Sequence, residues 1–193
     1  MNFLDILIRP AGGNFRTKNT VALFSDNLKR NQKIVDIGAG SCQIAEYIRD
    51  KYQTDITPID VVDYNKTNLK LVLYNGKKIP FENQMFDIAL IIFVLHHSKD
   101  QEVILEEAQR VAKKIIILED TPRSSIERLL WHFWDWLLNL GHNVSMTYSA
   151  KTEKEWLKLF NKLNFKVVKK KNLRVGLPIL WSYQQSLFIL ETL

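Results

Sequence analysis

The part of the chain that most restricts its fold is residues 33–47, KIVDIGAGSCQIAEY. A short run of β-branched residues carries Asp36 and ends in the turn Gly38-Ala39-Gly40, and a helical pattern follows at once. Glycines let the backbone approach a ligand closely, and the unpaired N–H groups that begin a helix favour negative charge. The stretch predicts a strand, a glycine turn and a helix, with either a bound nucleotide or cofactor at the turn or simply tight packing.

Length and composition favour one intracellular domain. The 193 residues, 46% of them hydrophobic, suffice for one core and are few for two, so we expect a single domain over residues 1–193. The single cysteine, Cys42, excludes an internal disulfide framework and leaves too few thiolates for a cysteine zinc site, so we expect no metal. Without a signal-peptide pattern or an apolar run of membrane-spanning length, we expect a cytoplasmic protein with no transmembrane segment.

Strand and helix patterns alternate along most of the chain. Nearly continuous apolar strands of this kind predict a mainly parallel sheet with helices on both faces, and the last strand is expected to pair antiparallel at or near an edge. The predicted strands are residues 34–37, 54–61, 69–74, 86–95, 114–118, 165–168 and 180–190. The predicted helices are residues 2–8, 18–30, 124–141 and 152–163, and one that begins at Ser98 with Gln101 completing a capping box.

Polar residues gather where the strands of such a sheet end. Ligands of parallel α/β sheets bind at the carboxyl ends of the strands, so these residues are candidates for a site. They are Asp36 with the glycine turn, Asp60, Asn75, the segment 95–97 with its two histidines, and the pair Glu119-Asp120.

Positive charge is concentrated late in the chain. Residues 151–174 contain nine lysines and arginines against two glutamates, a local net charge of +7 within a total of +6. Such a segment can mark a phosphate-bearing partner, but four of its lysines recur at helical spacing, as on any solvated helix face.

Several motifs in order resemble the class I S-adenosylmethionine-dependent methyltransferases, in particular the small-molecule branch of methyltransferase type 11. The motifs are DIGAG after a strand, an acid at Asp60 twenty residues beyond Gly40, and the run KKIPFENQMFDIALIIFVLHH. The later EEAQRVAKKIIILED and KTEKEWLKLFNKLNFKVV extend the resemblance to roughly residues 18–190. It implies a Rossmann-like three-layer α/β/α sandwich whose mainly parallel, seven-stranded sheet has one antiparallel strand near the C-terminus.

The resemblance also implies S-adenosylmethionine as cofactor and a role for each matching residue. Asp36, Gly38 and Gly40 would bind the methionine end, and Asp60 would accept hydrogen bonds from the ribose hydroxyls. Asn75 stands where an acid often binds the adenine amino group, and Phe93 follows the fourth strand as a further cofactor contact. Cys42 occupies a position where a third glycine is common. A Rossmann dehydrogenase would prefer G-x-G-x-x-G, whose last position is Gln43 here.

The acceptor is less determined than the cofactor. His96 and His97 follow the fourth strand, where the reactive methyl should lie, so they are candidate general bases; packing of the loop is the alternative. The aromatic stretch 124–141 and the N-terminal helices within residues 1–30 are a candidate cap over an apolar or aromatic small molecule; a core helix or a helix in a membrane interface is the alternative for 124–141. Two other functions stay open: an RNA methyltransferase that uses residues 151–174, and a non-catalytic cofactor-binding partner subunit.

Overall fold

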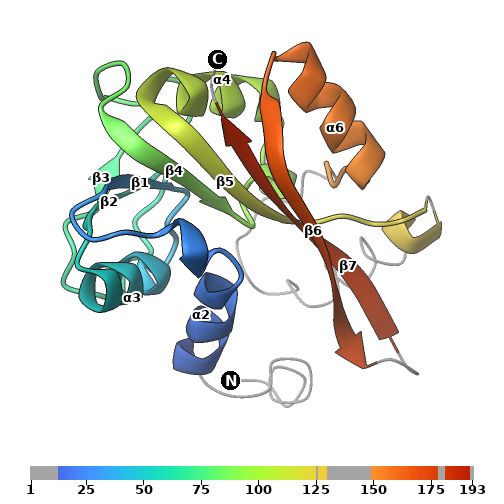
Figure 1. Cartoon of the computed structure of the whole chain (residues 1–193), viewed down its shortest axis with the longest axis horizontal. Coiled ribbons are helices and arrows are strands. Elements are labelled where there is room, and N and C mark those ends of the chain that lie inside the picture. Colours follow the sequence, from blue (N-terminus) through green and yellow to red (C-terminus); the bar gives the residue numbers. More distant parts are fainter. Residues whose placement is uncertain (1–12, 125, 130–148, 178–180, 192–193) are drawn as a thin grey trace.

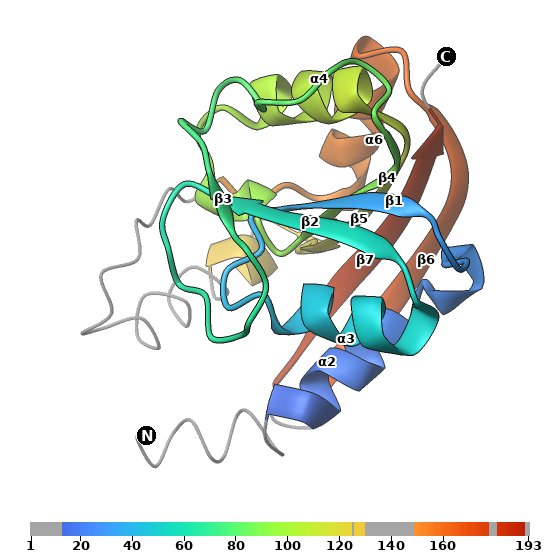
Figure 2. The same cartoon turned by 90° about the vertical axis from the view of Figure 1, so that its left-hand side faces the viewer.

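The sheet at the centre of the fold has helices on both of its faces. The computed structural model describes residues 13–124, 126–129, 149–177 and 181–191. Its seven strands form one sheet in the order β3-β2-β1-β4-β5-β7-β6 (Figure 1). Figure 2 shows helices α4 and α6 on one face of this sheet and α2 and α3 on the other. The predicted three-layer α/β/α sandwich is confirmed.

The strands follow the predicted pattern of directions. Those that pair in parallel are β1 (Lys33–Ile37), β2 (Asp55–Asp60), β3 (Val72–Leu73), β4 (Phe86–Ile92) and β5 (Ala112–Asp120). The strand β7 (Trp181–Glu191) lies antiparallel between β5 and the edge strand β6 (Lys166–Leu177). Only β7 is reversed, so both the seven strands and the near-edge antiparallel strand are as predicted.

The helices bury apolar stripes in two cores, one on each face of the sheet. On one face, α4 (Gln101–Val111) and α6 (Glu153–Lys162) cover the alternate strand residues that include Val35, Ala89 and Ile115. On the other face, α2 (Gly13–Ala22) and α3 (Gln43–Tyr52) cover the intervening residues, such as Ile34 and Leu90. Because successive strand residues point to opposite faces, a strand covered on both sides must be apolar throughout.

The N-terminal helix and the start of α4 differ from prediction. The helix predicted at residues 18–30 begins earlier, at Gly13, ends at Ala22, and is followed by the 3-10 turn η1 (Ser25–Asn27). The apolar residues Val21, Phe24 and Leu28 are all buried, because the turn directs Phe24 into the core. The capping box of Ser98 and Gln101 is wrong: Asp100 precedes α4 without a side-chain cap, and the amide of Gln101 is buried instead.

Four strand lengths also differ. The fifth strand, predicted at residues 114–118, extends from Ala112 to Asp120 in β5. The third predicted strand keeps only two residues in β3, and the fourth ends at Ile92, before the 3-10 turn η2 (Leu95–His97). The strand predicted at residues 165–168 continues to Leu177 in β6. At the sheet edge, β6 exposes its lysines, so its sequence lacks the alternation that marks a half-buried strand.

Two predictions fall largely outside the described residues. These are the helix at residues 2–8 and most of the aromatic helix at residues 124–141, of which residues 126–129 are helical. In the part of the chain that the structure describes, no helix combines the length and the apolar character that crossing a membrane requires.

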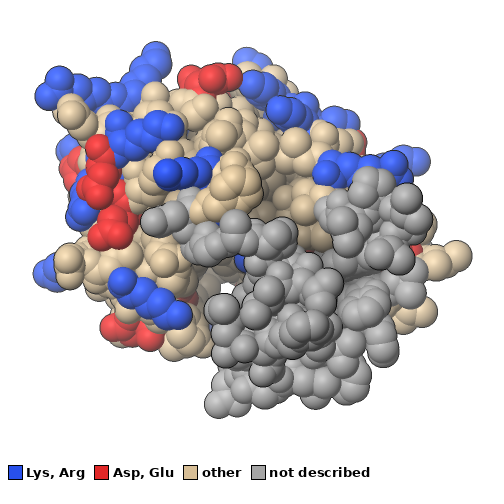
Figure 3. Space-filling view, turned by 90° about the horizontal axis from the view of Figure 1, so that it is seen from below, with Lys and Arg blue, Asp and Glu red and all other residues tan. Residues whose placement is uncertain are grey.

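The basic segment is spread over α6 and β6. On α6 the lysines 154 and 158 are exposed opposite the buried Trp156, as on a solvated helix face. Three other lysines form ion pairs with carboxylates, namely Lys162 with Glu102, Lys166 with Glu191 and Lys170 with Glu153. In the face shown in Figure 3, the lysine and arginine side chains form separate groups among uncharged and acidic ones.

Candidate functional site

The glycine turn lies at the point where the order of the sheet reverses. From β1 the chain passes to β2 and β3 on one side, and then to β4 and β5 on the other. At such a switch point the loops that leave neighbouring strands diverge and open a crevice beyond the carboxyl ends. The loop after β1 is therefore placed where an α/β sheet binds ligands.

The two glycines of this turn have different surroundings. Both have a positive φ, 73° at Gly38 and 53° at Gly40, a conformation that glycine adopts most easily. A Cβ on Gly38 would lie 2.5 Å from Cγ2 of Val94, whereas a Cβ on Gly40 would meet nothing within 4 Å. Gly38 is needed for packing against the segment that follows β4, and Gly40 faces open space.

Asp60 holds the glycine loop from the end of β2. Its Oδ2 accepts a hydrogen bond from the N–H of Gly40 at 2.8 Å, and its Oδ1 accepts one from the N–H of Val61 at 2.7 Å. Oδ1 also accepts a longer hydrogen bond from the N–H of Val62 at 3.4 Å, so three of the four acceptor positions of the carboxylate are used. One position is left for a further donor, such as a ligand hydroxyl group.

Asp36 is buried with no partner of its own. It is 3% exposed, and no described residue donates a hydrogen bond to its carboxylate. Burial, together with the nearby negative charge of Asp60, raises the pKa of Asp36 to about 7. A bound ammonium group would supply the missing opposite charge, so this site fits the methionine end of S-adenosylmethionine.

Asn75 and Phe93 flank the site less directly. The Asn75 side chain is exposed, and its Oδ1 accepts from the N–H groups of Lys77 and Lys78 at 2.9 and 3.0 Å. The oxygen proposed for the adenine amino group therefore also holds a local turn. Phe93 has a positive φ of 57°, and the guanidinium carbon of Arg16 lies 5.8 Å from the centre of its ring.

The histidines lie on η2, directly after β4. His96 is 7% exposed, and its Nδ1 lies 2.6 Å from Oε2 of Glu119 at the end of β5. Glu119 is fully buried, and its Oε1 accepts from the N–H groups of Val94 and Leu95 at 2.8 and 2.6 Å. The ring of His97 lies against that of His96, with 3.9 Å between the ring centres and an angle of 48° between the ring planes. One carboxylate thus joins the backbone of the turn to the His96 ring.

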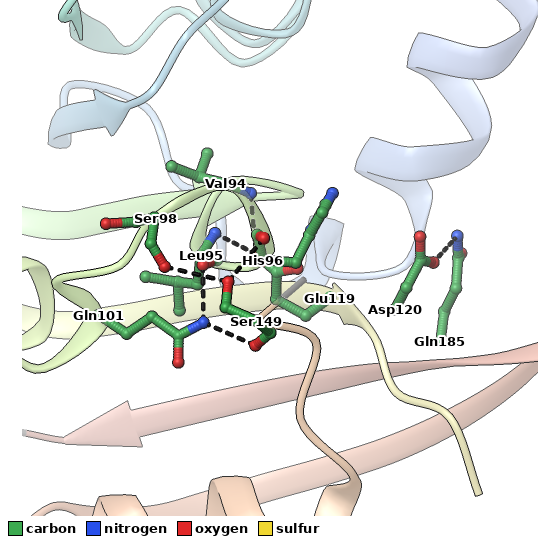
Figure 4. Close-up of polar contacts among 9 residues, drawn as sticks. All are labelled: Val94, Leu95, His96, Ser98, Gln101, Glu119, Asp120, Ser149 and Gln185. Carbon is green, nitrogen blue, oxygen red and sulfur yellow. Dashed lines mark hydrogen bonds and ion pairs between the residues drawn. The ribbon is translucent and has the colours of Figure 1, made fainter. Parts of the chain in front are cut away.

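Two further residues fix this turn, and neither was a candidate from sequence (Figure 4). The Gln101 amide donates to the backbone oxygens of Leu95 and Ser149 at 2.8 and 2.9 Å. The Ser149 hydroxyl donates to the backbone oxygens of His96 at 2.7 Å and Ser98 at 3.0 Å. Glu119 had a sequence signal, its place at a strand end, but Ser149 had none.

The structure thus gathers most of the predicted residues along adjoining strand ends. Contact between Gly38 and Val94 joins the loop after β1 to the turn that carries His96. Asp36 and Phe93 lie on the face covered by α2 and α3, whereas Glu119 reaches η2 from the opposite face. Asn75 is the most peripheral of the set, since it follows the short edge strand β3.

Comparison with known proteins agrees with this architecture. Residues 35–116 match the family model of the type 11 methyltransferase domain. Over 86 residues the chain is 33% identical to the uncharacterized protein MJ1123 of Methanocaldococcus jannaschii, which covers 43% of this chain. The chain matches 42% of the length of that relative.

Solved structures extend the likeness to nearly the whole chain. A putative methyltransferase of Bacillus halodurans has a TM-score of 0.69 at 13% identity, over 94% of this chain and 99% of that one. A SAM-dependent methyltransferase of Methanosarcina mazei has a TM-score of 0.67 at 16% identity, over 89% and 97% of the two chains. A Haloferax volcanii complex of a putative methyltransferase with the Trm112 methyltransferase activator has a TM-score of 0.67 at 15% identity, over 93% and 94%.

Because the sequence identities are low, these solved structures show the fold alone. The family model matches the segment from β1 to β5, which contains the glycine loop and the histidine turn. The buried, unpartnered Asp36 and the open space at Gly40 agree with a cofactor that has an ammonium group. Residues 35–116 of this chain thus match the type 11 methyltransferase domain, and the described residues have the fold of the class I S-adenosylmethionine-dependent methyltransferases, whose cofactor is S-adenosylmethionine.

Proposed function

We propose that the protein transfers a methyl group to a small-molecule acceptor. The observation that carries this proposal is the buried carboxylate of Asp36, which has no hydrogen-bond partner among the described residues and lies near a glycine that faces open space. An isolated buried acid is unfavourable in the free protein. Its retention at the carboxyl edge of the sheet is explained if a cationic ligand binds there.

Each residue of the site has a definite task in this proposal. Asp36 binds the ammonium group, the loop of Gly38 and Gly40 surrounds the methionine end, and Asp60 accepts from the ribose hydroxyls. Phe93 and Asn75 complete the cofactor contacts beside β4 and β3. When bound, S-adenosylmethionine supplies a methyl group already activated by its sulfonium, so the protein mainly has to align the acceptor.

The proposed acceptor is apolar or aromatic, enclosed by a cap made of residues 1–30 and 124–141. Within the second of these ranges, Ile126 and Leu129 expose apolar side chains, which supports an apolar lining. Strands β6 and β7 also continue as a two-stranded arm beyond the end of β5, from the pair Arg174 and Gln184 to the pair Leu177 and Trp181 (Figure 1). This arm extends past the carboxyl edge, on the side of the cofactor residues.

The test is calorimetric titration of the purified chain with S-adenosylmethionine. We expect the wild type to bind it and the variants Asp36→Ala and Asp60→Ala to lose binding. Asp55→Ala is the matched control, because Asp55 is an exposed acid at the opposite end of the same strand as Asp60. Absence of binding by the folded wild type would contradict the proposal.

A second candidate function is methylation of RNA. It is supported by the exposed cations of α6 and β6, such as Lys154, Lys158, Lys169 and Lys171. The ion pairs of three neighbouring lysines reduce the charge available to phosphates. This function predicts RNA binding that weakens steeply with salt, and no binding at low salt would remove it.

A third candidate is a cofactor-binding subunit that acts only with a partner. It is supported by the Haloferax volcanii protein of the same fold, which forms a complex with a methyltransferase activator. Purification of the tagged chain from its source cells would then recover a partner in constant proportion. A monodisperse chain that methylates an acceptor alone would exclude this function.

A further inference from the structure

Strand β6 forms one edge of the sheet, and no described strand pairs with its outer side. It is the longest of the seven strands, with 12 residues from Lys166 to Leu177, and it pairs only with β7 (Figure 1). The side chains of residues 166–172 are all exposed. An edge strand of this kind presents a row of backbone N–H and C=O groups that can pair with another extended chain. The outer side of β6 is therefore a candidate docking edge.

The register of the sheet shows which backbone groups of β6 point outward. The N–H of Thr121, just beyond β5, donates to the oxygen of Gln184 at 2.8 Å, so Gln184 and every second residue of β7 direct their backbone groups to β5. The intervening residues of β7 bond to β6, where their partners include Lys169, Lys171 and Leu173. The outward backbone groups of β6 belong to the alternate residues, which include Lys170, Asn172 and Arg174.

Two lysines of β6 have no carboxylate beside them. Lys170 lies on the face of the sheet that α6 covers, because it forms an ion pair with Glu153 of that helix. Lys169 and Lys171 alternate with Lys170, so they lie together on the opposite face. Both are exposed, and neither forms an ion pair with a carboxylate of the described residues. Two cations at this spacing match acids at every second position of an added strand.

A second copy of this chain is a poor occupant of the edge. Between residues 166 and 174, β6 contains five lysines and arginines and no acidic residue. Pairing of two such strands would place like charges opposite one another, which is destabilising. Lysines on edge strands commonly prevent self-association in this way. The same lysines attract a strand of opposite charge, so charge complementarity selects an acidic partner.

We propose that the outer side of β6 binds an acidic, extended segment of a partner protein as an added strand. The partner strand exchanges backbone hydrogen bonds with Lys170, Asn172 and Arg174, and its acids contact Lys169 and Lys171. This docking goes beyond methyl transfer, because it depends neither on the cofactor nor on the acceptor. It also differs from RNA binding, since phosphates are attracted by the lysines but do not pair with a regular row of backbone N–H and C=O groups.

The experiment measures fluorescence anisotropy of a labelled peptide of alternating glutamate and threonine with the full-length chain at low salt. Lys170→Pro removes one outward N–H and places the proline ring on the outer side, while the hydrogen bonds between β6 and β7 remain. Lys170→Ala is the matched control, because it loses the same side chain and keeps the N–H. We expect the wild type and Lys170→Ala to bind the peptide, and Lys170→Pro to bind it about tenfold more weakly.

Charge reversal tests the two exposed lysines of the strand. The double variant Lys169→Glu/Lys171→Glu should lower the affinity for the acidic peptide by about tenfold, because two attractive pairs become repulsive. Lys154→Glu/Lys158→Glu makes the same change of charge on the exposed face of α6. It should have a much smaller effect, since those lysines lie on a helix rather than on the edge strand. Binding should also weaken as salt is added.

Three results would overturn the proposal: no binding of the acidic peptide by the folded wild type, equal binding by Lys170→Pro and Lys170→Ala, or equal binding of a peptide with lysine in place of glutamate. Circular dichroism checks that each variant is folded. If Lys170→Pro does not fold, Arg174→Pro and Arg174→Ala make the same comparison farther along β6. A labelled single-stranded RNA is the parallel probe, and RNA binding without peptide binding would assign the edge to nucleic acid instead.

Discussion

The two ends of the site contain buried acids that differ in their hydrogen bonding. Asp36, at the end of β1, is 3% exposed and accepts no hydrogen bond from the described residues. Glu119, at the end of β5, is 0% exposed and has three partners, two backbone N–H groups and Nδ1 of His96. Burial alone therefore does not tell which role an acid has.

The difference follows from what each acid must do. An acid whose hydrogen bonds are satisfied within the chain adds stability and fixes geometry, because removing it leaves its donors unpaired. An acid without partners lowers the stability of the free protein and gains its partner when a cation binds. The contrast agrees with the proposed role of Asp36 in ligand binding, and it gives Glu119 a structural role in holding the turn after β4.

Substitution of the two acids should have opposite effects on stability, and this is the largest difference that we expect. Glu119→Ala leaves three buried donors without an acceptor and should lower the free energy of unfolding by about 3 to 5 kcal/mol. Asp36→Asn should raise it at pH 8, because a charged buried group is removed. Urea denaturation of the chain without cofactor measures both.

The sign of the Asp36 effect depends on pH. The pKa of Asp36 is about 7 in the folded chain and 3.8 as its ordinary value, so folding disfavours the ionised form. The stability gained by Asp36→Asn should therefore be small below pH 4 and grow as the pH rises to 7, with no further change above it. A loss of stability at pH 8 that matches that of Glu119→Ala would refute the contrast.

The two glycines of the loop should also differ in their effect on stability, by a smaller amount than the two acids. Gly38→Ala should cost about 2 to 4 kcal/mol of stability, because its Cβ would overlap Val94 and its φ is positive. Gly40→Ala should cost only about 1 kcal/mol, since its Cβ meets nothing. Thermal denaturation compares them, and calorimetry should show that Gly40→Ala weakens cofactor binding.

A second substitution at Val94 checks the cause of the Gly38 effect. The double variant Gly38→Ala/Val94→Ala removes the side-chain atoms that the new methyl group would meet. We expect it to regain part of the stability lost by Gly38→Ala. Equal loss in the single and double variants would mean that backbone strain, rather than the close contact, accounts for the effect.

The affinity for S-adenosylmethionine should depend on pH through Asp36. Below a pKa of about 7 the carboxyl group is protonated in the free chain and must lose its proton to bind an ammonium group. Affinity should rise about tenfold per pH unit up to pH 7 and then level off. Calorimetry in buffers of different ionisation enthalpy would detect the released proton, and the dependence should disappear in Asp36→Asn if binding remains measurable.

The smallest effect is expected at Asn75, at the outer end of the cofactor region. Asn75→Ala removes the acceptor for the N–H groups of Lys77 and Lys78 and should cost about 1 kcal/mol of stability. Asn75→Asp keeps that acceptor and is the matched control. If Asn75 also binds the cofactor, Asn75→Ala should weaken calorimetric affinity more than Asn75→Asp does; equal affinities would exclude a contact.

Much of the fold could be predicted because its signals are local. The strands β1, β2, β4 and β5 are mainly apolar, and the turn after β1 has glycines at two of its three positions with positive φ, the third being Cys42. The length of β6 could not be predicted, since an edge strand with exposed lysines has no alternation of apolar and polar residues. The end of α2 was missed because Phe24 and Leu28 continue its stripe through a 3-10 turn.

The residues of the candidate site also divide into those that the sequence predicts and those that only the structure reveals. Asp36, Gly38, Gly40 and Asp60 lie within 25 residues of one another in a recognisable pattern, and the structure places them at neighbouring strand ends. The partners of His96 lie farther along the chain, 23 residues away at Glu119 and 53 residues away at Ser149. Glu119 was a candidate only through its place at a strand end, and the local sequence of Ser149 gave no signal.

By itself, the sequence determined the class of fold, the glycine loop and the acids at the strand ends, because strand periodicity and turn chemistry depend on neighbouring residues. Only the tertiary structure decided that Asp36 accepts no hydrogen bond from the described residues and that Glu119 has three partners. The reason is that these hydrogen bonds depend on which strands lie side by side. β4 and β5 are adjacent and parallel, and this places Glu119 under the turn that carries His96. Asp36 is buried beside the negative charge of Asp60, and no described residue donates a hydrogen bond to it.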